Sequence, residues 1–477
     1  MPKFSIDTKS ESKPFPHFWE RCVFGGHASL ALRDDWRKHL KICHDELGFQ
    51  FVGLQGIFND ETGIYRVVDG QKQLSFYNLD NIFDFIVGIG MKPFLCLGFM
   101  PSGMASGKQT VMPFQANITP AKNLSDWGDL IKRLIGHLQV RYGKAELRSW
   151  LFEVWNEPNN EKFWAGTKEE YFQLYAETSR TIKKIDDEIK VGGPGSAVGE
   201  WISEFLDFAH QEKVLVDFIS THQYPINTVA NQNMNLEFLM AAAKREALKT
   251  MSTQAKKDAL GLPLFITAWN CSPGSRDVHH DETYMPAFII KTIADQQGLA
   301  DGYAFRSMTD IFDDEGSATN PFHGGSGLLN IYNIPKPSFH AFKFLNQLEG
   351  GQIAVKRDHP TKVEVLALKS ESKIQFLVYH HDVPFSPMKE EKLTIEISGI
   401  TTFKDATLKR IDEEHGNPRK RWIGMGSPRY LSHEEIAMIT AETAMKKEPV
   451  ELRKESELFS FELQIPPQGV AFVEISL

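Results

Sequence analysis

Eight short runs of apolar residues recur through roughly the first 345 positions of this chain, and they constrain its fold more than any other feature. Each run is continuous rather than alternating, which is typical of strands buried on both faces, as in a parallel sheet. The runs cover residues 22–25, 49–57, 92–99, 150–155, 189–193, 216–224, 262–269 and 302–308. Segments with helical periodicity lie between them, including residues 79–89, 168–185 and 281–297. This alternation predicts a (β/α)8 TIM barrel, a fold whose functional residues lie at the carboxyl ends of the strands.

The pattern changes near residues 348–351. Beyond them, apolar and polar residues mostly alternate over strand-length stretches, at 363–368, 374–379, 393–397, 406–411, 458–465 and 470–475. We therefore expect a barrel over residues 15–347 and a C-terminal β-sandwich packed on it over residues 348–477. Residues 1–14 could join the sandwich, and the charged segment 432–446 is expected to be helical.

Composition excludes several classes of function. Lys and Arg number 53 and Asp and Glu number 62, so the net charge is −9, and neither a nucleic acid nor a membrane is an expected partner. Aromatic residues make up 11% of the chain, which fits an ordinary core and also sugar binding, because sugar rings stack on aromatic side chains. No run reaches about 18 apolar residues, and the N-terminus lacks the apolar core of a signal peptide. We therefore expect a cytoplasmic protein, or one that has lost an export signal.

The four cysteines are Cys22, Cys43, Cys96 and Cys271. None belongs to a CxxC pair, so their spacing gives no zinc or redox signature, and buried free thiols are expected. Nothing in the sequence fixes the oligomeric state, and a homo-oligomer stays open.

One motif carries chemistry. The fourth apolar run ends in Trp155-Asn156-Glu157-Pro158, which places Glu157 at the carboxyl end of a barrel strand, where the proline ends the ladder. Glycoside cleavage uses two carboxylates: one protonates the leaving oxygen, and the other attacks the anomeric carbon or activates water. Glu157 is thus a candidate general acid, and Asn156 can bind a sugar hydroxyl. Glu153 is expected to be a buried carboxylate that orients its neighbours.

A set of longer motifs surrounds this one. They read LGFMPSGMASG (97–107), FEVWNEPNN (152–160), VGGPGS (191–196), STHQYP (220–225), PFHGGSGLLN (321–330) and IPKPSFHAF (334–342). Together they resemble glycoside hydrolase family 39, and DEEHGNPRKRW (412–422) extends the resemblance into the second domain. The chain is most similar to the bacterial β-xylosidase branch of that family, which also contains α-L-iduronidases. The resemblance implies a retaining mechanism with no metal and no organic cofactor.

The resemblance also implies roles for single residues. Glu157 matches the acid/base. His222 and Tyr224 match positions that contact the sugar and the nucleophile, although a capped strand end would explain them too. His323 lies in the stretch that matches the active-site loop after the eighth strand, where two glycines could equally well build a plain turn. Tyr284 is expected either to close the pocket or to pack in the core.

Position 268 departs from the family pattern. The chain reads Thr267-Ala268-Trp269-Asn270 where the family resembles T-E-W-N-x-S, with its nucleophilic glutamate in second place. Alanine cannot form a glycosyl ester, so the chain as written is expected to be inactive. Two interpretations are open. One is an engineered Glu→Ala change made to hold an uncleaved ligand. The other is a natural loss, leaving a sugar-binding pseudoenzyme or an enzyme that recruits water through another carboxylate.

Three further positions differ from the family. Gln55 stands where histidine is usual, Cys96 where glutamate is common, and Arg306 where an aromatic sugar platform is common. Arg306 in the sugar site would favour an anionic glycan, whereas its pairing with Asp310 would leave a neutral sugar. We predict a retaining exo-glycosidase that releases a terminal sugar from oligosaccharides, a β-xylosidase in the first instance. The alternatives are a family 39 enzyme for another, anionic glycan, and a sugar-binding protein without catalysis.

Overall fold

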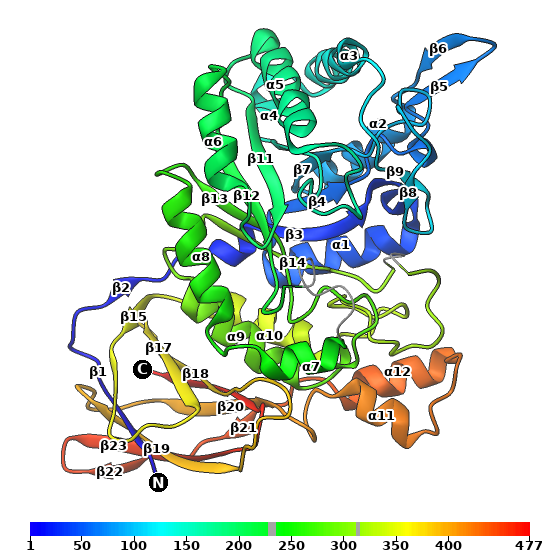
Figure 1. Ribbon diagram of the computed structural model, residues 1–477. Coiled ribbons are helices and arrows are strands. Elements are labelled where there is room, and N and C mark those ends of the chain that lie inside the picture. The colour runs from blue at the N-terminus through cyan, green and yellow to red at the C-terminus, as the bar shows by residue number, and fades with distance from the viewer. Residues whose placement is uncertain (228–234, 312–314) are drawn as a thin grey trace.

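A closed barrel of eight parallel strands forms the larger part of the molecule. The computed structural model describes residues 1–227, 235–311 and 315–477. The barrel strands are, in order, β3 (Cys22–His27), β4 (Phe51–Gln55), β7 (Lys92–Leu97), β10 (Leu151–Val154), β11 (Lys190–Ala197), β12 (Phe218–Gln223), β13 (Leu264–Trp269) and β14 (Gly302–Arg306). Each of the eight apolar runs overlaps one of these strands, so the predicted (β/α)8 barrel is confirmed (Figure 1).

Helices and short hairpins connect these strands. The longer helices are α1 (Asp34–Leu47), α2 (Tyr77–Gly88), α3 (Leu124–Tyr142), α5 (Lys168–Ile185), α6 (Ile202–Gln211), α8 (Ala247–Asp258), α9 (Tyr284–Gln296) and α10 (Pro337–Asn346). Between them lie α4 (Lys144–Leu147), α7 (Leu236–Ala242) and two hairpins, β5 (Tyr65–Val68) with β6 (Gln71–Leu74) and β8 (Thr110–Val111) with β9 (Ala116–Asn117). Helix α5 has the expected bounds because Thr167 and Glu170 form a capping box at its start. Helix α9 begins later than expected because a 3-10 turn, Val278–Asp281, precedes it.

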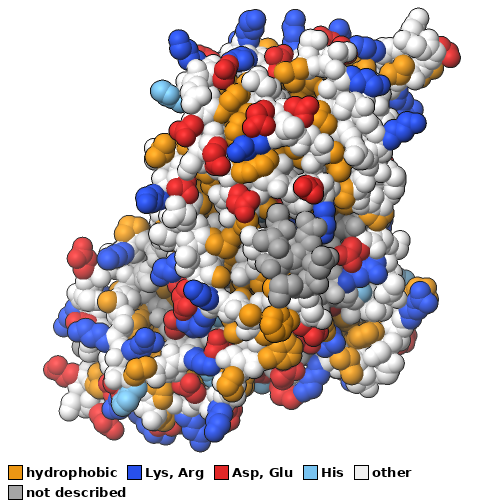
Figure 2. Space-filling view, in the orientation of Figure 1, with side chains coloured by type: hydrophobic (Ala, Val, Ile, Leu, Met, Phe, Trp, Pro, Cys, Tyr) orange, Lys and Arg blue, Asp and Glu red, His pale blue; other side chains and the backbone are white. Residues whose placement is uncertain are grey.

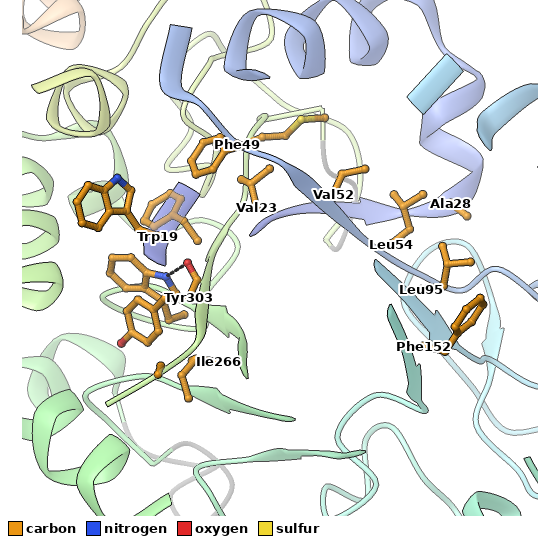
Figure 3. Close-up of a cluster of buried hydrophobic side chains, with 14 of the residues drawn as sticks. Trp19, Val23, Ala28, Phe49, Val52, Leu54, Leu95, Phe152, Ile266 and Tyr303 are labelled. Atoms are coloured by element: carbon orange, nitrogen blue, oxygen red, sulfur yellow. Dashed lines mark hydrogen bonds between the residues drawn. The ribbon is translucent and has the colours of Figure 1, made fainter. Parts of the chain in front are cut away.

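Strand side chains divide between two cores. The outer core, which packs against the helices, includes Val23, Val52, Leu95, Phe152 and Ile266 (Figure 3). The lumen holds a separate cluster, in which the Phe94 ring lies 5.6 Å from the rings of Phe218 and Phe265. These rings fill the barrel from within, so the open space for a ligand is expected at the rim rather than in the lumen.

The C-terminal part of the chain, together with two N-terminal strands, forms a β-sandwich, as expected. One sheet has the order β16-β1-β19-β23-β22 and the other β2-β15-β17-β18-β24-β20-β21. Their strands are β1 (Lys3–Asp7), β2 (Lys13–Pro14), β15 (Gly351–Ile353), β16 (Val355–Arg357), β17 (Val363–Lys369), β18 (Lys373–His380), β19 (Glu391–Ser398), β20 (Asp405–Ile411), β21 (Glu448–Pro449), β22 (Arg453–Glu455), β23 (Leu458–Ile465) and β24 (Val470–Ser476). The N-terminal strands β1 and β2 pair with strands of these sheets, while the domain division at residue 347 stays a prediction.

The sandwich packs directly on the barrel. Phe344 of α10 stacks on Phe472 of β24 with ring centroids 5.2 Å apart. Two helices, α11 (Pro418–Gly424) and α12 (His433–Glu442), leave the sandwich and lie at the lower right of Figure 1; α12 falls within the segment expected to be helical.

The four cysteines are buried free thiols, as expected.

On the face shown in Figure 2, acidic and basic side chains are interspersed rather than gathered by sign. Within the described ranges, every helix is too short or too polar to cross a lipid bilayer.

Candidate active site

A cavity of about 420 Å³ lies at the carboxyl ends of the barrel strands. Seven of the nine site residues selected from the sequence line it: Gln55, Asn156, Glu157, His222, Tyr224, Ala268 and Arg306. They come from the ends of β4, β10, β12, β13 and β14. The apolar and aromatic share of the lining includes Phe24 and Phe163, flat rings of the kind on which a sugar face can pack.

Backbone strain at the end of β10 sets the position of Glu157. Trp155 has φ 68° and Glu157 has φ 46°, left-handed values that cost side-chain-bearing residues energy and persist only where the surroundings enforce them. The Glu157 amide donates to the Gly195 carbonyl at 2.9 Å. Gly195 itself has φ 62°, and a Cβ there would lie 2.9 Å from the Trp155 oxygen. A glycine at 195 therefore lets β11 approach closely enough to hold the Glu157 turn.

Two side chains grip the Glu157 carboxylate. Nδ1 of His222 lies 2.8 Å from Oε1, and the Asn160 amide donates to Oε2 at 2.9 Å. Burial alone would raise the pKa of Glu157, but the hydrogen bond and charge of His222, the Asn160 hydrogen bond and the charge of Arg306 outweigh it and lower the pKa. With alanine at position 268, Glu157 is therefore held in its anionic form near neutral pH.

Position 268 sits beside this pair. In the β12–β13 ladder, His222 is the register partner of Ala268, so the residue that holds Glu157 also neighbours position 268. The ladders on both sides of β13 shift register near this point. As a result, Ala268 lines the cavity, although the preceding Thr267 also points inward and hydrogen-bonds Glu153. A side chain at 268 thus projects into the cavity next to the acid/base candidate.

Glu153 lies one level deeper in the barrel. Its Oε1 accepts a hydrogen bond from Thr267 Oγ1 at 2.9 Å, and it lines a small cavity of about 10 Å³ together with Gln55, Cys96 and His222. Burial raises the pKa of Glu153, and His222, Ser220 and Thr267 offset only part of that rise. The residue expected to orient its neighbours thus anchors the strand position directly before Ala268.

Arg306 reaches the cavity from the end of β14. Its Nη1 donates to the Pro273 carbonyl at 3.1 Å, and its charge is among those that lower the pKa of Glu157. Asp310, the partner considered from the sequence, instead forms an ion pair with Lys336, with Oδ2 and Nζ 3.2 Å apart.

A family profile described as Glycosyl hydrolases family 39 matches residues 2–458. The chain belongs to glycosyl hydrolase family 39. It is 45% identical over 464 residues to a protein named Beta-xylosidase from Caldicellulosiruptor saccharolyticus, covering 96% of this chain and 95% of that protein. It is 34% identical over 439 residues to a Beta-xylosidase from Geobacillus stearothermophilus, covering 88% and 85%. Among solved structures, a monomeric beta-xylosidase from Caulobacter crescentus CB15 matches with a TM-score of 0.86 at 28% identity, covering 99% of each chain.

Two expected site residues of this family 39 chain do not line the cavity. Tyr284 is the first residue of α9 and turns toward the sandwich, where its ring lies 5.4 Å from that of His381. On α9 itself, its ring lies 5.9 Å from that of Phe288. Of the two roles considered for Tyr284, the packing one fits this position. His323 contacts the Asn320 carbonyl through Nδ1 at 3.2 Å, within its own loop and outside the cavity lining.

The family 39 cavity also uses residues that the sequence analysis did not select. Asn160, Lys162 and Phe163 follow Glu157 in the same loop, and Leu236 and Leu239 come from the short helix α7. Asn160 had one available signal, since it stands three residues after the acid candidate within the quoted motif. Lys162 and Phe163 lie in a loop whose side chains follow no period, and Leu236 and Leu239 lie on a helix of only seven residues, so the inward direction of all four depends on the tertiary fold.

Proposed function

We propose that this chain has the binding site and the acid/base of a retaining exo-acting β-xylosidase, and that Ala268 stops it from completing hydrolysis. One observation carries the proposal: Glu157 is gripped by His222 and Asn160 at the barrel rim, and His222 is the ladder partner of Ala268. The two relatives named Beta-xylosidase, similar over most of both chains, support xylosides as the substrate.

The retaining route needs two carboxylates about 5–5.5 Å apart. A glutamate at 268 would attack the anomeric carbon while Glu157 gives its proton to the leaving oxygen, so the C–O bond breaks as the glycosyl ester forms. Glu157, now anionic, would then take a proton from water, whose oxygen displaces the ester with overall retention. The Ala268 chain has no atom to make the first bond, so the reaction halts at the bound glycoside.

Restoring the carboxylate tests the proposal. The Ala268→Glu variant should hydrolyse nitrophenyl β-xyloside in preference to other nitrophenyl glycosides, and proton NMR should show the β-anomer of the released sugar first. The isosteric Ala268→Gln variant is the matched control and should stay inactive. A folded Ala268→Glu chain that hydrolyses no glycoside in the panel would contradict the proposal.

Arg306 favours one alternative substrate class. A guanidinium in the cavity wall prefers a carboxylate or sulfate to a neutral ring, and Lys162 adds a second cation to the lining. If the glycan is anionic, Arg306→Ala should weaken its binding by about 1.5–3 kcal/mol, as for a hydrogen bond to a charged group, and should leave the neutral analogue unaffected. Calorimetry on the Ala268 chain measures this directly because the ligand survives. Equal losses for the charged and neutral sugars would exclude this class.

The cavity also supports a function of another kind, sugar binding without catalysis. The observation that favours it is Ala268 itself, in a cavity that is still lined by Asn156, Glu157 and His222. The Ala268→Glu variant distinguishes the enzyme from the sugar-binding protein. A sugar-binding protein would bind xylosides as before and would not hydrolyse them.

A further inference from the structure

Three buried side chains meet just beyond β13, next to the active site but outside it. One candidate ligand atom from each of Cys271, Asp277 and His280 lies within 4.8 Å of the other two. All three side chains are buried, and none lines the active-site cavity. We propose that they form a structural zinc site that fixes the connection between β13 and α9.

The His280 ring is prepared as a ligand. Its Nδ1 lies 2.9 Å from the Gly324 carbonyl oxygen, which can only accept, so Nδ1 carries the ring proton. Nε2 then holds a lone pair, and it is buried without a hydrogen-bond partner among the residues that the structure describes. A proton on one ring nitrogen, given to a backbone carbonyl, is the usual support of a metal-bound histidine.

Hydrogen bonds hold the Asp277 carboxylate in place and leave it able to bind a metal ion. Oδ1 receives the backbone amide of His279 at 3.0 Å and contacts His279 Nδ1 at 2.7 Å, while Oδ2 accepts from Ser272 Oγ at 2.6 Å. An ionised carboxylate offers about four lone-pair sites. Three contacts therefore leave one lone pair, on Oδ2, for a metal ion.

This ligand set selects zinc. A cysteine sulfur with an imidazole disfavours Mg²⁺ and Ca²⁺, which take oxygen ligands, and a Cys-His-carboxylate set suits Zn²⁺. Zinc bonds of about 2.0–2.3 Å in a tetrahedron put ligand atoms roughly 3.3–3.8 Å apart. The three atoms, already within 4.8 Å, need only a small closing movement. On binding, the Cys271 thiol gives its proton to solvent, so one proton is released per zinc ion.

A fourth ligand can come from solvent. Cys271 and Tyr284 line a cavity of about 20 Å³, which is room for one water molecule. The exposed Lys249 lines the same cavity, so this cavity offers zinc and water a path from the surface.

The site would brace a wall of the substrate cavity. Pro273, Gly274 and Ser275 lie between Cys271 and Asp277 in the chain, and all three line the active-site cavity. Cys271 is three residues after Ala268. A zinc ion joining Cys271 to Asp277 and His280 would close this stretch into a short loop and hold it in place, while taking no part in glycoside chemistry.

Cobalt titration of chelator-stripped protein tests the proposal. Co²⁺ should give a thiolate-to-cobalt charge-transfer band in the near ultraviolet and tetrahedral bands in the visible, saturating at one equivalent and vanishing on addition of Zn²⁺. The melting temperature should rise with Zn²⁺. A stripped, folded parent without the charge-transfer band would overturn the site. The readout does not involve hydrolysis, so the result is independent of the proposed function.

Variants locate the ligands. Cys271→Ser should abolish the charge-transfer band, and His280→Gln should weaken Zn²⁺ binding by more than the roughly 10–100-fold that loss of a supporting residue brings. Cys43→Ser, which changes another buried thiol, is the matched control and should bind as the parent does. A band that persists in folded Cys271→Ser would refute the assignment. If a variant fails to fold, the cobalt titration of the unmutated chain still tests the proposal by itself.

Discussion

A fully buried lysine offers the sharpest test of how the loops around the site are held. Nζ of Lys336 lies 2.6 Å from Asp281 Oδ1 and 3.2 Å from Asp310 Oδ2, and the lysine side chain is 0% exposed. The two carboxylates in turn accept the backbone amides of Gly324 at 2.6 Å and Gly327 at 2.7 Å. Lys336 therefore pairs with two acids that hold the connection between β14 and α10.

We predict that Lys336→Met lowers the free energy of unfolding by about 3–5 kcal/mol, because it leaves buried carboxylates without their partner. Lys343→Met, within the helix α10 that follows Lys336, is a matched control. Lys343 pairs with Glu46 at 2.6 Å, but these side chains are 37% and 44% exposed, so its loss should cost only about 0–1 kcal/mol. Urea unfolding followed by circular dichroism at pH 7 measures both, with a lower midpoint at unchanged slope as the expected sign.

Two further results are expected from the charges of this buried cluster. The double variant Lys336→Met with Asp310→Asn should recover part of the loss, because one stranded charge is removed. Burial already raises the pKa of Asp310. A carboxyl whose folded-state pKa is raised gains stability as pH falls through that pKa, so the gap between Lys336→Met and the parent should narrow toward acid pH. A Lys336→Met loss no larger than that of Lys343→Met would refute the account.

Three other predictions concern the active site. Azide should partly restore turnover of a nitrophenyl β-xyloside by the Ala268 chain and give a glycosyl azide of inverted configuration, seen by NMR; full turnover without azide would show that position 268 is not the nucleophile site. His222→Ala should raise the pKa of Glu157 in a carbon NMR titration, because the His222 hydrogen bond is the strongest influence that lowers this pKa. The control variant His323→Ala should leave the pKa of Glu157 unchanged. An unchanged pKa in His222→Ala would contradict the contact between His222 and Glu157. Ala268→Glu should also raise the pKa of Glu157, by like-charge repulsion, and an equal or lower value would count against Glu157 as the partner carboxylate.

The barrel was predictable because its signal is local. A continuous apolar run of four to eight residues between amphipathic segments is explained by few structures other than a two-sided buried strand. Glu157 could be found for the same reason: it ends such a run, and Pro158 closes it. The departure at Ala268 could be found because the residues on both sides of it match the family pattern.

Other parts of the site depend on tertiary structure. Strand periodicity alone would place Thr267 and Ala268 on opposite faces, yet register shifts on both sides of β13 let both serve the inner side of the rim. Tyr284 was a poor candidate for the pocket because a 3-10 turn ends just before it and directs α9 toward the sandwich. The cluster of Cys271, Asp277 and His280 follows no spacing that signals a metal, because the path of the chain between β13 and this turn, rather than a sequence motif, brings the three residues together.

The Ala268 site shows how the retaining mechanism opposes stability. In this chain the depressed pKa of Glu157 favours folding: that contribution is present above the unfolded pKa of about 4.3 and is lost as pH falls through the lower folded-state value. A glutamate at 268 would set a second negative charge beside His222, which already serves Glu157, and would cancel part of that gain. Yet the general acid must carry a proton near neutral pH, and the same repulsion supplies it. In the proposed mechanism, a carboxylate at 268 would keep the acid/base protonated for its task at the expense of the fold. With alanine at 268, His222, Asn160 and Arg306 outweigh burial and favour the anionic Glu157.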